Sequence, residues 1–155
     1  MRRYKIGGSL KVLREYRSSR TYSRQRFSYL HGKPRYVVLI KAKSTDITSC
    51  VINEGCKVVA DSAFNRCESL TNIVIPDGLT AIGDSAFSGC SGLTSITIPD
   101  SVTSIGEWAF YNCSGLTSIT IGNSVTSIGD YAFRDCSGLT SIRRTAFSIR
   151  VSLKT

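Results

Sequence analysis

Histidine, methionine and tryptophan each occur once in the 155 residues, and proline occurs only three times. Because His31 is the only histidine and lies in a basic stretch, no Cys–His or Ser–His pair can be proposed for nucleophilic catalysis. The cysteines form no C-x-x-C pair and have no nearby histidine to complete a zinc site. The sequence therefore argues against an enzyme, and it predicts no catalytic residue, cofactor or metal.

Long apolar runs are also missing. No segment approaches the roughly 20 apolar residues that a membrane-spanning helix needs. The first 30 residues carry positive charge without the apolar core of a signal peptide. As written, the sequence predicts a cytoplasmic protein with no transmembrane segment.

What the chain has instead is an internal repeat with a period of 23 residues. A fixed period of this size, with leucine-like residues at regular spacing, predicts a stacked solenoid in which each unit buries its apolar face against its neighbours. The clearest columns are Phe64, Phe87, Phe110 and Phe133; Cys67, Cys90, Cys113 and Cys136; Leu70, Leu93, Leu116 and Leu139; and Ile73, Ile96, Ile119 and Ile142.

Each unit divides into three short pieces, which are clearest over 93–115. Period-two alternation over 96–98 predicts a strand, and Pro99 ends it because proline has no N–H for a ladder. A second extended segment follows over 102–105, and the apolar spacing over 109–113 suits about one turn of helix. Stacked units would place their strands in a parallel sheet, roughly 4.8 Å apart.

The unit from Ile98 to Thr120 reads I-P-D-S-V-T-S-I-G-x-x-A-F-x-x-C-S-G-L-T-S-I-T and resembles the BspA-type leucine-rich repeat, over roughly residues 47–142. The resemblance implies a right-handed leucine-rich-repeat solenoid, with a parallel β-sheet on its concave side and short strands or single helical turns on its convex side. It also implies an adhesin-like protein of the cell surface or a secreted one, which binds host proteins or other cells and has no catalytic residues. This chain departs from larger members in its few repeats, its basic N-terminus and the lack of a visible signal peptide.

The repeat and the charge pattern divide the chain into four segments. We expect a basic extension over 1–35, a capping strand region over 36–46, the solenoid over 47–143 and a degenerate end over 144–155. Arg144 stands in an otherwise isoleucine column, which indicates either a charged edge that discourages stacking or a truncated or frame-altered gene. The expected state is a monomer or a weak end-to-end associate.

All six cysteines fall on inward columns, including Cys50 and Cys56. We expect a packed ladder of thiols, because buried free cysteine behaves as a small hydrophobe. Disulfides between adjacent coils, or a metal, are the alternative, since the coil spacing alone does not forbid a bridge.

Two columns are acidic. Stacked carboxylates can bind calcium, but the same positions suit turns and the satisfaction of backbone N–H groups, which we favour. The columns are Glu54, Asp77, Asp100 and Asn123, and Asp61, Asp84, Glu107 and Asp130.

In a repeat protein, columns that depart from consensus carry the information about a partner. Trp108 and Tyr111 should be i, i+3 neighbours on the convex side, and Tyr131 and Arg134 should repeat that geometry one coil along. Aromatic and arginine side chains are enriched at interface hot spots, so these four are the candidate protein-binding residues. The alternative is that the aromatic rings lie flat and shield the phenylalanine column.

The charge is uneven: residues 1–43 hold 13 Lys or Arg against Glu15 alone, whereas residues 44–155 hold 7 against 10 Asp or Glu. The extension is either disordered, a cap on the first coil, or a binder of nucleic acid or an anionic surface. Our main prediction is a non-enzymatic protein-binding module; the runner-up is a polyanion binder that acts through Arg2, Arg3, Lys5, Arg14, Arg17, Arg20, Arg24 and Arg26.

Overall fold

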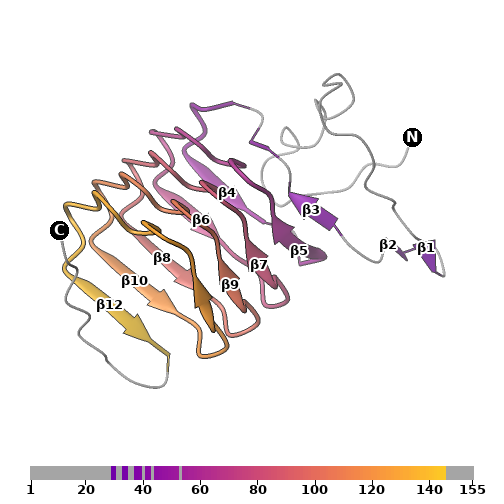
Figure 1. Ribbon diagram of the computed structural model, residues 1–155. Coiled ribbons are helices and arrows are strands. Elements are labelled where there is room, and N and C mark those ends of the chain that lie inside the picture. Colours follow the sequence, from indigo (N-terminus) through magenta and orange to yellow (C-terminus); the bar gives the residue numbers. More distant parts are fainter. Residues whose placement is uncertain are drawn as a thin grey trace.

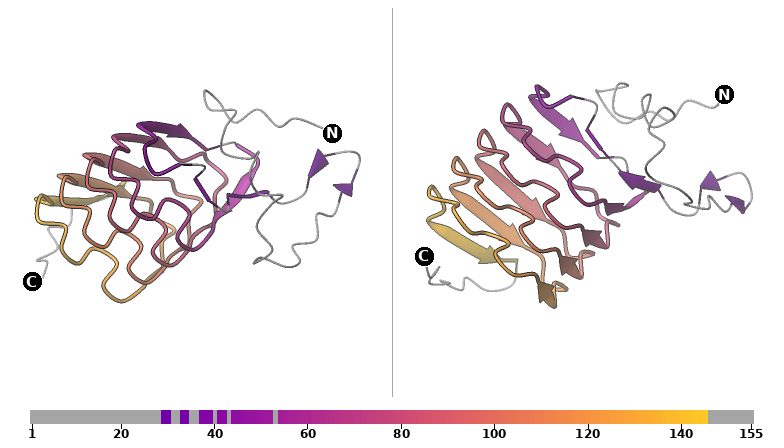
Figure 2. Two further views of the ribbon diagram at one scale, coloured as in Figure 1. Left: turned by 90° about the horizontal axis from the view of Figure 1, so that it is seen from above. Right: turned by 45° about the horizontal axis from the view of Figure 1, so that its top comes forward.

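The chain folds as a solenoid in which each 23-residue unit forms one coil (Figures 1 and 2). Each coil presents three faces, which we call the long-strand face, the short-strand face and the turn face. The computed structural model describes residues 29–30, 33–34, 37–39, 41–42, 44–52 and 54–145.

The long-strand face carries one strand from each coil, and these strands run parallel. Equivalent residues pair in register, so that Ile96 lies opposite Ile119 and Ile119 opposite Ile142. Inward and outward side chains alternate along each strand, as the sequence predicts. The strands are β4 (Ser49–Val51), β6 (Asn72–Val74), β8 (Ser95–Ile98), β10 (Ser118–Ile121) and β12 (Ser141–Arg144).

This sheet is interrupted once. β8, β10 and β12 form one hydrogen-bonded sheet and β4 and β6 another, with no ladder between β6 and β8. In the other coils the N–H of Thr71, Thr117 and Thr140 donates to the equivalent carbonyl one coil earlier, but no such bond joins Thr94 to Thr71. The stack is held together at this point by its other two faces.

The short-strand face is continuous, because its parallel sheet has the order β11-β9-β7-β5-β3. β3 falls in the region where we expected a capping strand, and it pairs with β5. Before it, β1 (Tyr29–Leu30) and β2 (Lys33–Pro34) form an antiparallel pair. The strands of this face are β3 (Val37–Leu39), β5 (Cys56–Val59), β7 (Ala81–Ile82), β9 (Ser104–Ile105) and β11 (Ser127–Ile128).

The turn face consists of residues 61–66, 84–89, 107–112 and 130–135, and here the expected turn of helix is wrong. The segments are turns, and no helix occurs among the described residues. In each coil three alternate N–H groups donate to the next coil instead of within the segment, for example Trp108 to Asp130 at 3.0 Å and Phe110 to Ala132 at 2.8 Å. In a helix these N–H groups would instead donate to carbonyls of the same segment, four residues earlier.

The core consists of the predicted columns, each packed as a continuous row. Successive rings of the phenylalanine column lie 5.0, 5.2 and 5.3 Å apart, with their planes within 9° of parallel. Among the described residues no polar or charged side chain is buried. The core is less well covered in the last described coil, where Phe133 is half-buried and Ile128 is 43% exposed because no further coil follows among the described residues.

The six cysteines are all buried as thiols and form no disulfide, as the thiol ladder predicts. The thiols of Cys90, Cys113 and Cys136 each donate to the carbonyl of a phenylalanine in the preceding coil, at 3.0 to 3.1 Å. Burial raises the pKa of Cys50 and Cys67 to about 11 and that of Cys90 to about 12. These thiols are packing groups with weak donors and stay protonated at neutral pH.

Candidate protein-binding surface

The four candidate residues meet on the turn face of the last two complete coils; we call them the aromatic cluster. Within one coil the rings of Trp108 and Tyr111 lie 5.0 Å apart at 75°, in edge contact. Across the coils Trp108 lies 4.7 Å from Tyr131. The guanidinium of Arg134 lies over the Tyr131 ring at 5.2 Å. The cluster is therefore a connected surface patch formed from two neighbouring coils.

The Asp135 carboxylate lies at the edge of the aromatic cluster and interacts with both Tyr111 and Arg134. A hydrogen bond from the Tyr111 hydroxyl to the Asp135 carboxylate raises the pKa of that hydroxyl. Arg134 lies 4.0 Å from the same carboxylate, so its charge is balanced locally. Tyr131 is the most exposed of the three rings, at 54%. These contacts connect the side chains of the cluster to one another.

The backbone beneath the aromatic cluster is unusual for such bulky side chains. Trp108 and Tyr131 have φ angles of 56° and 57°, and Ser62 and Ser85 share this conformation at the same position of the earlier coils. The coil imposes the left-handed geometry, which costs a residue with a Cβ about 1–2 kcal/mol. The chain thus places its only tryptophan at a left-handed position where two earlier coils have serine.

Burial of the phenylalanine column does not need an aromatic residue at the position of Ser62, Ser85 and Trp108. Phe64 and Phe87 are fully buried, with 0% exposure, in coils that carry Ser62 and Ser85 where later coils have aromatic residues. Phe110 is likewise at 0%, so Trp108 adds no burial that serine fails to give. Shielding by an aromatic ring is therefore unnecessary for these three phenylalanines, whereas Phe133, in the coil of Tyr131, is only partly buried and the alternative stays open there.

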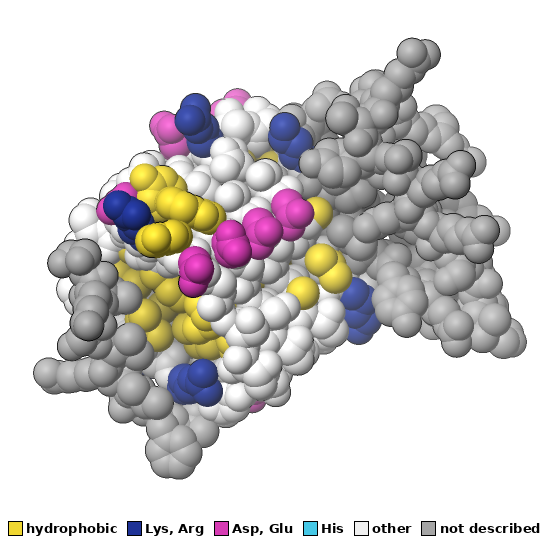
Figure 3. Space-filling view, viewed as in Figure 1, with side chains coloured by type: hydrophobic (Ala, Val, Ile, Leu, Met, Phe, Trp, Pro, Cys, Tyr) yellow, Lys and Arg dark blue, Asp and Glu magenta, His cyan; other side chains and the backbone are white. Residues whose placement is uncertain are grey.

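An acidic row runs beside the aromatic cluster along the stack (Figure 3). Its carboxylates help to join the coils, since Asp61 Oδ1 accepts the N–H of Asp84 at 2.9 Å and Asp84 Oδ1 accepts the N–H of Glu107 at 2.8 Å. The carboxylates do satisfy N–H groups, but the expectation that these N–H groups belong to the same turn is wrong, because the donors belong to the next coil. No cluster suited to a metal ion occurs among the described residues. The row consists of Asp61, Asp84, Glu107 and Asp130.

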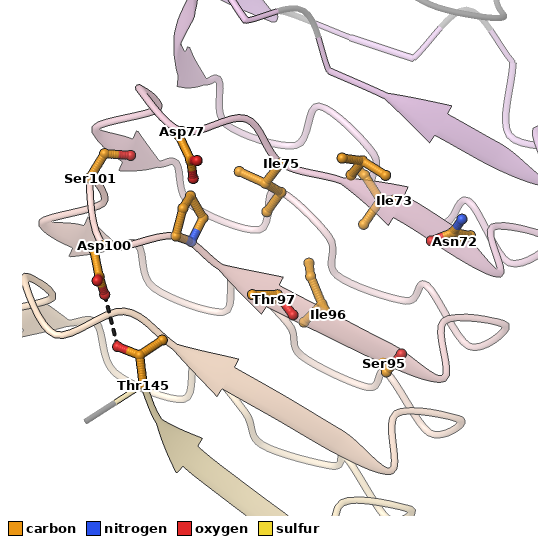
Figure 4. Close-up of a pocket in the computed structure, with 12 residues that line it drawn as sticks. Asn72, Ile73, Ile75, Asp77, Ser95, Ile96, Thr97, Asp100, Ser101 and Thr145 are labelled. Carbon is orange, nitrogen blue, oxygen red and sulfur yellow. Dashed lines mark hydrogen bonds between the residues drawn. The ribbon is translucent and has the colours of Figure 1, made fainter. Parts of the chain in front are cut away.

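The interruption of the long-strand sheet leaves an open hollow of about 660 Å³ between β6 and β8 (Figure 4). Ile73, Ile75 and Ile96 line it, with Asp77 and Asp100 at one end. The N–H of Asn123 and the hydroxyl of Thr145 hold the pKa of the Asp100 carboxyl below its usual value. The hollow thus combines buried isoleucine side chains with two carboxylates and with small polar groups such as Ser95 and Thr97.

The rest of the long-strand face carries small polar groups, most of which already form hydrogen bonds within the stack. A column of threonines uses its hydroxyls to bond the carbonyl one coil back, as in Thr117 Oγ1 to Thr94 O at 3.0 Å. Val51 and Val74 are the exposed large hydrophobic residues on this face, at 43% and 46% exposure. We did not single out Val51 from the sequence, although alternation along β4 would have placed it outward.

The polyanion alternative concerns Arg2 to Arg26, and these residues lie outside the part of the chain that the structure describes. It stays a prediction. Within the described part no helix has the length and hydropathy needed to cross a bilayer.

A family model described as "BspA type Leucine rich repeat region (6 copies)" matches residues 42–152, more than half of the chain. The chain belongs to the BspA-type leucine-rich repeat family. The assignment agrees with the resemblance found in the repeat unit, and with the parallel-stranded solenoid. No curated protein gives a significant match.

Solved structures of similar proteins share the fold. A leucine-rich repeat protein of T. pallidum matches with 27% identity and a TM-score of 0.60, over 70% of this chain and 64% of the other. One from Bacteroides ovatus matches with 35% identity and a TM-score of 0.60, over 66% and 26%. A leucine-rich cell surface protein of Faecalibacterium prausnitzii matches with 27% identity and a TM-score of 0.55, over 69% and 36%. This chain therefore spans less than two thirds of each of these relatives.

Proposed function

We propose that the chain is a non-enzymatic binding module that uses the aromatic cluster on its turn face to hold another protein, in an adhesin-like role. The fold of the family favours protein interaction, and one of the similar structures is that of a leucine-rich cell surface protein. The cluster supplies what such a role needs: large, connected aromatic side chains with an exposed centre, at the position where earlier coils have serine.

The single observation that carries this proposal is the contact of Trp108 with Tyr131 across two coils, in left-handed conformations that neither residue favours. Strained positions persist where the surrounding structure enforces them, and they concentrate at functional sites. Here the coil enforces the backbone, whereas burial of Phe110 does not need an aromatic residue at the position of Trp108.

The test replaces both aromatics with the serine of the earlier coils. Trp108→Ser with Tyr131→Ser retains the coil, because Ser62 and Ser85 already occupy this geometry. Cross-linking capture from the native source, followed by quantitative mass spectrometry, should show protein partners that the wild type captures and the double variant loses. Ser62→Ala is the matched control on the same face. Equal capture by the wild type and the double variant would remove the cluster as the binding site.

The same experiment separates the polyanion alternative. Removal of residues 1–35 should leave protein capture in place if the solenoid holds the partner. If that deletion instead abolishes all binding, and the lost binding is salt-sensitive and directed at polyanions, the extension is the functional part.

A further inference from the structure

The charge of the turn face identifies the kind of partner that the aromatic cluster suits. Over residues 61–66, 84–89, 107–112 and 130–135 the face carries five acidic side chains and two arginines. The acidic row contributes four of the five, all of them exposed. Among the described residues only Arg134 and Asp135 form an ion pair. The row therefore presents stacked like charges without a cation from this part of the chain.

The acidic row and the aromatic cluster occupy adjacent positions within each coil. Glu107 precedes Trp108 in the chain and Asp130 precedes Tyr131, and the acidic row runs beside the aromatic cluster on the surface (Figure 3). Arginine and lysine suit such a surface, because the charged head can meet the carboxylate while the cation contacts the ring face. Arg134 already lies over the Tyr131 ring in this way at 5.2 Å.

The hydrogen bonds of the acidic row leave capacity for an incoming cation. Asp61 and Asp84 each use one carboxylate oxygen, Oδ1, to accept a backbone N–H from the next coil. A carboxylate has two oxygens and about four lone-pair sites. The structural bond therefore fixes the carboxylate and still leaves its second oxygen available.

We propose that the turn face binds a basic, extended segment of a partner protein, which lies along the acidic row and ends with an arginine or lysine on the aromatic cluster. This rests on the proposed function and adds the chemistry of its partner. Three steps between coils of roughly 4.8 Å make the row about 14 Å long, which an extended segment of four or five residues covers. The sign of the face disfavours nucleic acid and anionic membranes at this site.

Trp108 is the only tryptophan of the chain, so its fluorescence reports binding at the cluster directly. The full chain is titrated with a short peptide in which arginine alternates with serine, and with the same peptide carrying glutamate for arginine. We expect the arginine peptide to change the fluorescence saturably, with weaker binding at higher salt. The glutamate peptide should give no saturable change. Tighter binding of the glutamate peptide would overturn the proposal.

A matched pair of triple variants tests the acidic row itself. Asp84→Asn, Glu107→Gln and Asp130→Asn remove three charges, and the side-chain amide introduced by Asp84→Asn would keep an oxygen for the N–H of Glu107. The control is Glu54→Gln, Asp77→Asn and Asp100→Asn, which removes the same residue types from the other acidic column, where Asn123 already occurs. We expect about a tenfold loss of peptide affinity for the first triple and little change for the second. Equal losses in both, or none in either, would contradict the proposal.

The outcomes also separate this inference from the proposed function. If the serine double variant loses its captured partner but the row triple keeps it, the cluster binds proteins and the basic chemistry is wrong. If the serine double variant loses nothing, the proposed function fails first. If the wild type associates with itself, and the row triple abolishes this, the occupant is a second copy of the chain and the assignment to another protein is wrong.

Discussion

The long-strand face and the turn face are formed by the same coils but use their side chains differently. On the long-strand face the threonine hydroxyls at 71, 117 and 140 bond the preceding coil, and small polar groups repeat from coil to coil. On the turn face the backbone geometry repeats, while Ser85 gives way to Trp108 and then Tyr131. Repetition thus supports the stack, and departure from it marks the surface that a partner can distinguish.

The largest expected difference in unfolding free energy is that between a core variant and a turn-face variant. Phe87 lies between Phe64 and Phe110 at 5.0 and 5.2 Å and is fully buried, so Phe87→Ala should cost about 3–5 kcal/mol of unfolding free energy. Trp108→Ser should cost far less, because Ser62 and Ser85 already occupy this backbone conformation and only the surface ring contacts with Tyr111 and Tyr131 are lost. Urea unfolding of the two variants beside the wild type measures this. A loss for Trp108→Ser as large as that for Phe87→Ala would show that the cluster is part of the core.

A second prediction concerns the thiols. The pKa values of Cys50, Cys67 and Cys90 are raised in the folded state, so these thiols keep protons that they lose on unfolding. Their contribution to the free energy of unfolding is therefore complete below about pH 9 and is lost as the pH rises toward 11 or 12. Each such thiol contributes a slope of up to about 1.4 kcal/mol per pH unit in that window.

Urea midpoints between pH 8 and 11 should therefore fall more steeply for the wild type than for Cys90→Ala. The comparison with this variant is needed because tyrosine and lysine titrate in the same range. If the urea midpoints of the two proteins fall in parallel, the Cys90 thiol does not contribute to the pH dependence of stability.

The smallest effect is expected on the long-strand face. Thr117→Val removes an exposed hydroxyl that bonds Thr94 O at 3.0 Å but keeps the branched shape. We expect a loss of about 0.5 kcal/mol or less and no change in partner binding. Thermal unfolding and the capture assay check both parts. A large loss of binding would move the recognition surface from the turn face to this one.

The period of 23 residues was sufficient to predict the rows of the core, because equivalent side chains must coincide when units stack in register. It also predicted that Trp108 and Tyr131 are neighbours, which their ring contact confirms. The turn segment was not predictable in the same way. The spacing of Ala109, Phe110 and Cys113 fits one helical turn as well as a turn whose N–H groups point to the next coil.

The interruption between β6 and β8 has no signal in the sequence. Asn72 and Ser95 begin these strands with polar residues much as Ser118 begins β10, yet β8 forms a ladder with β10 and not with β6. The exposure of Ile128 was also not foreseen, since its column is buried in the three earlier coils. The repeat reveals which residues are equivalent but not which coil lacks a neighbour.

The central claim is that the turn face, and not the long-strand face, binds the partner. The most direct measurement is the affinity of the captured partner for two double variants that each restore the residues of other coils. Trp108→Ser with Tyr131→Ser changes the turn face, and Val51→Thr with Val74→Thr changes the long-strand face, where Thr97 holds the same position. We predict at least about a tenfold loss for the first and no change for the second. A loss confined to the valine variant would contradict the account.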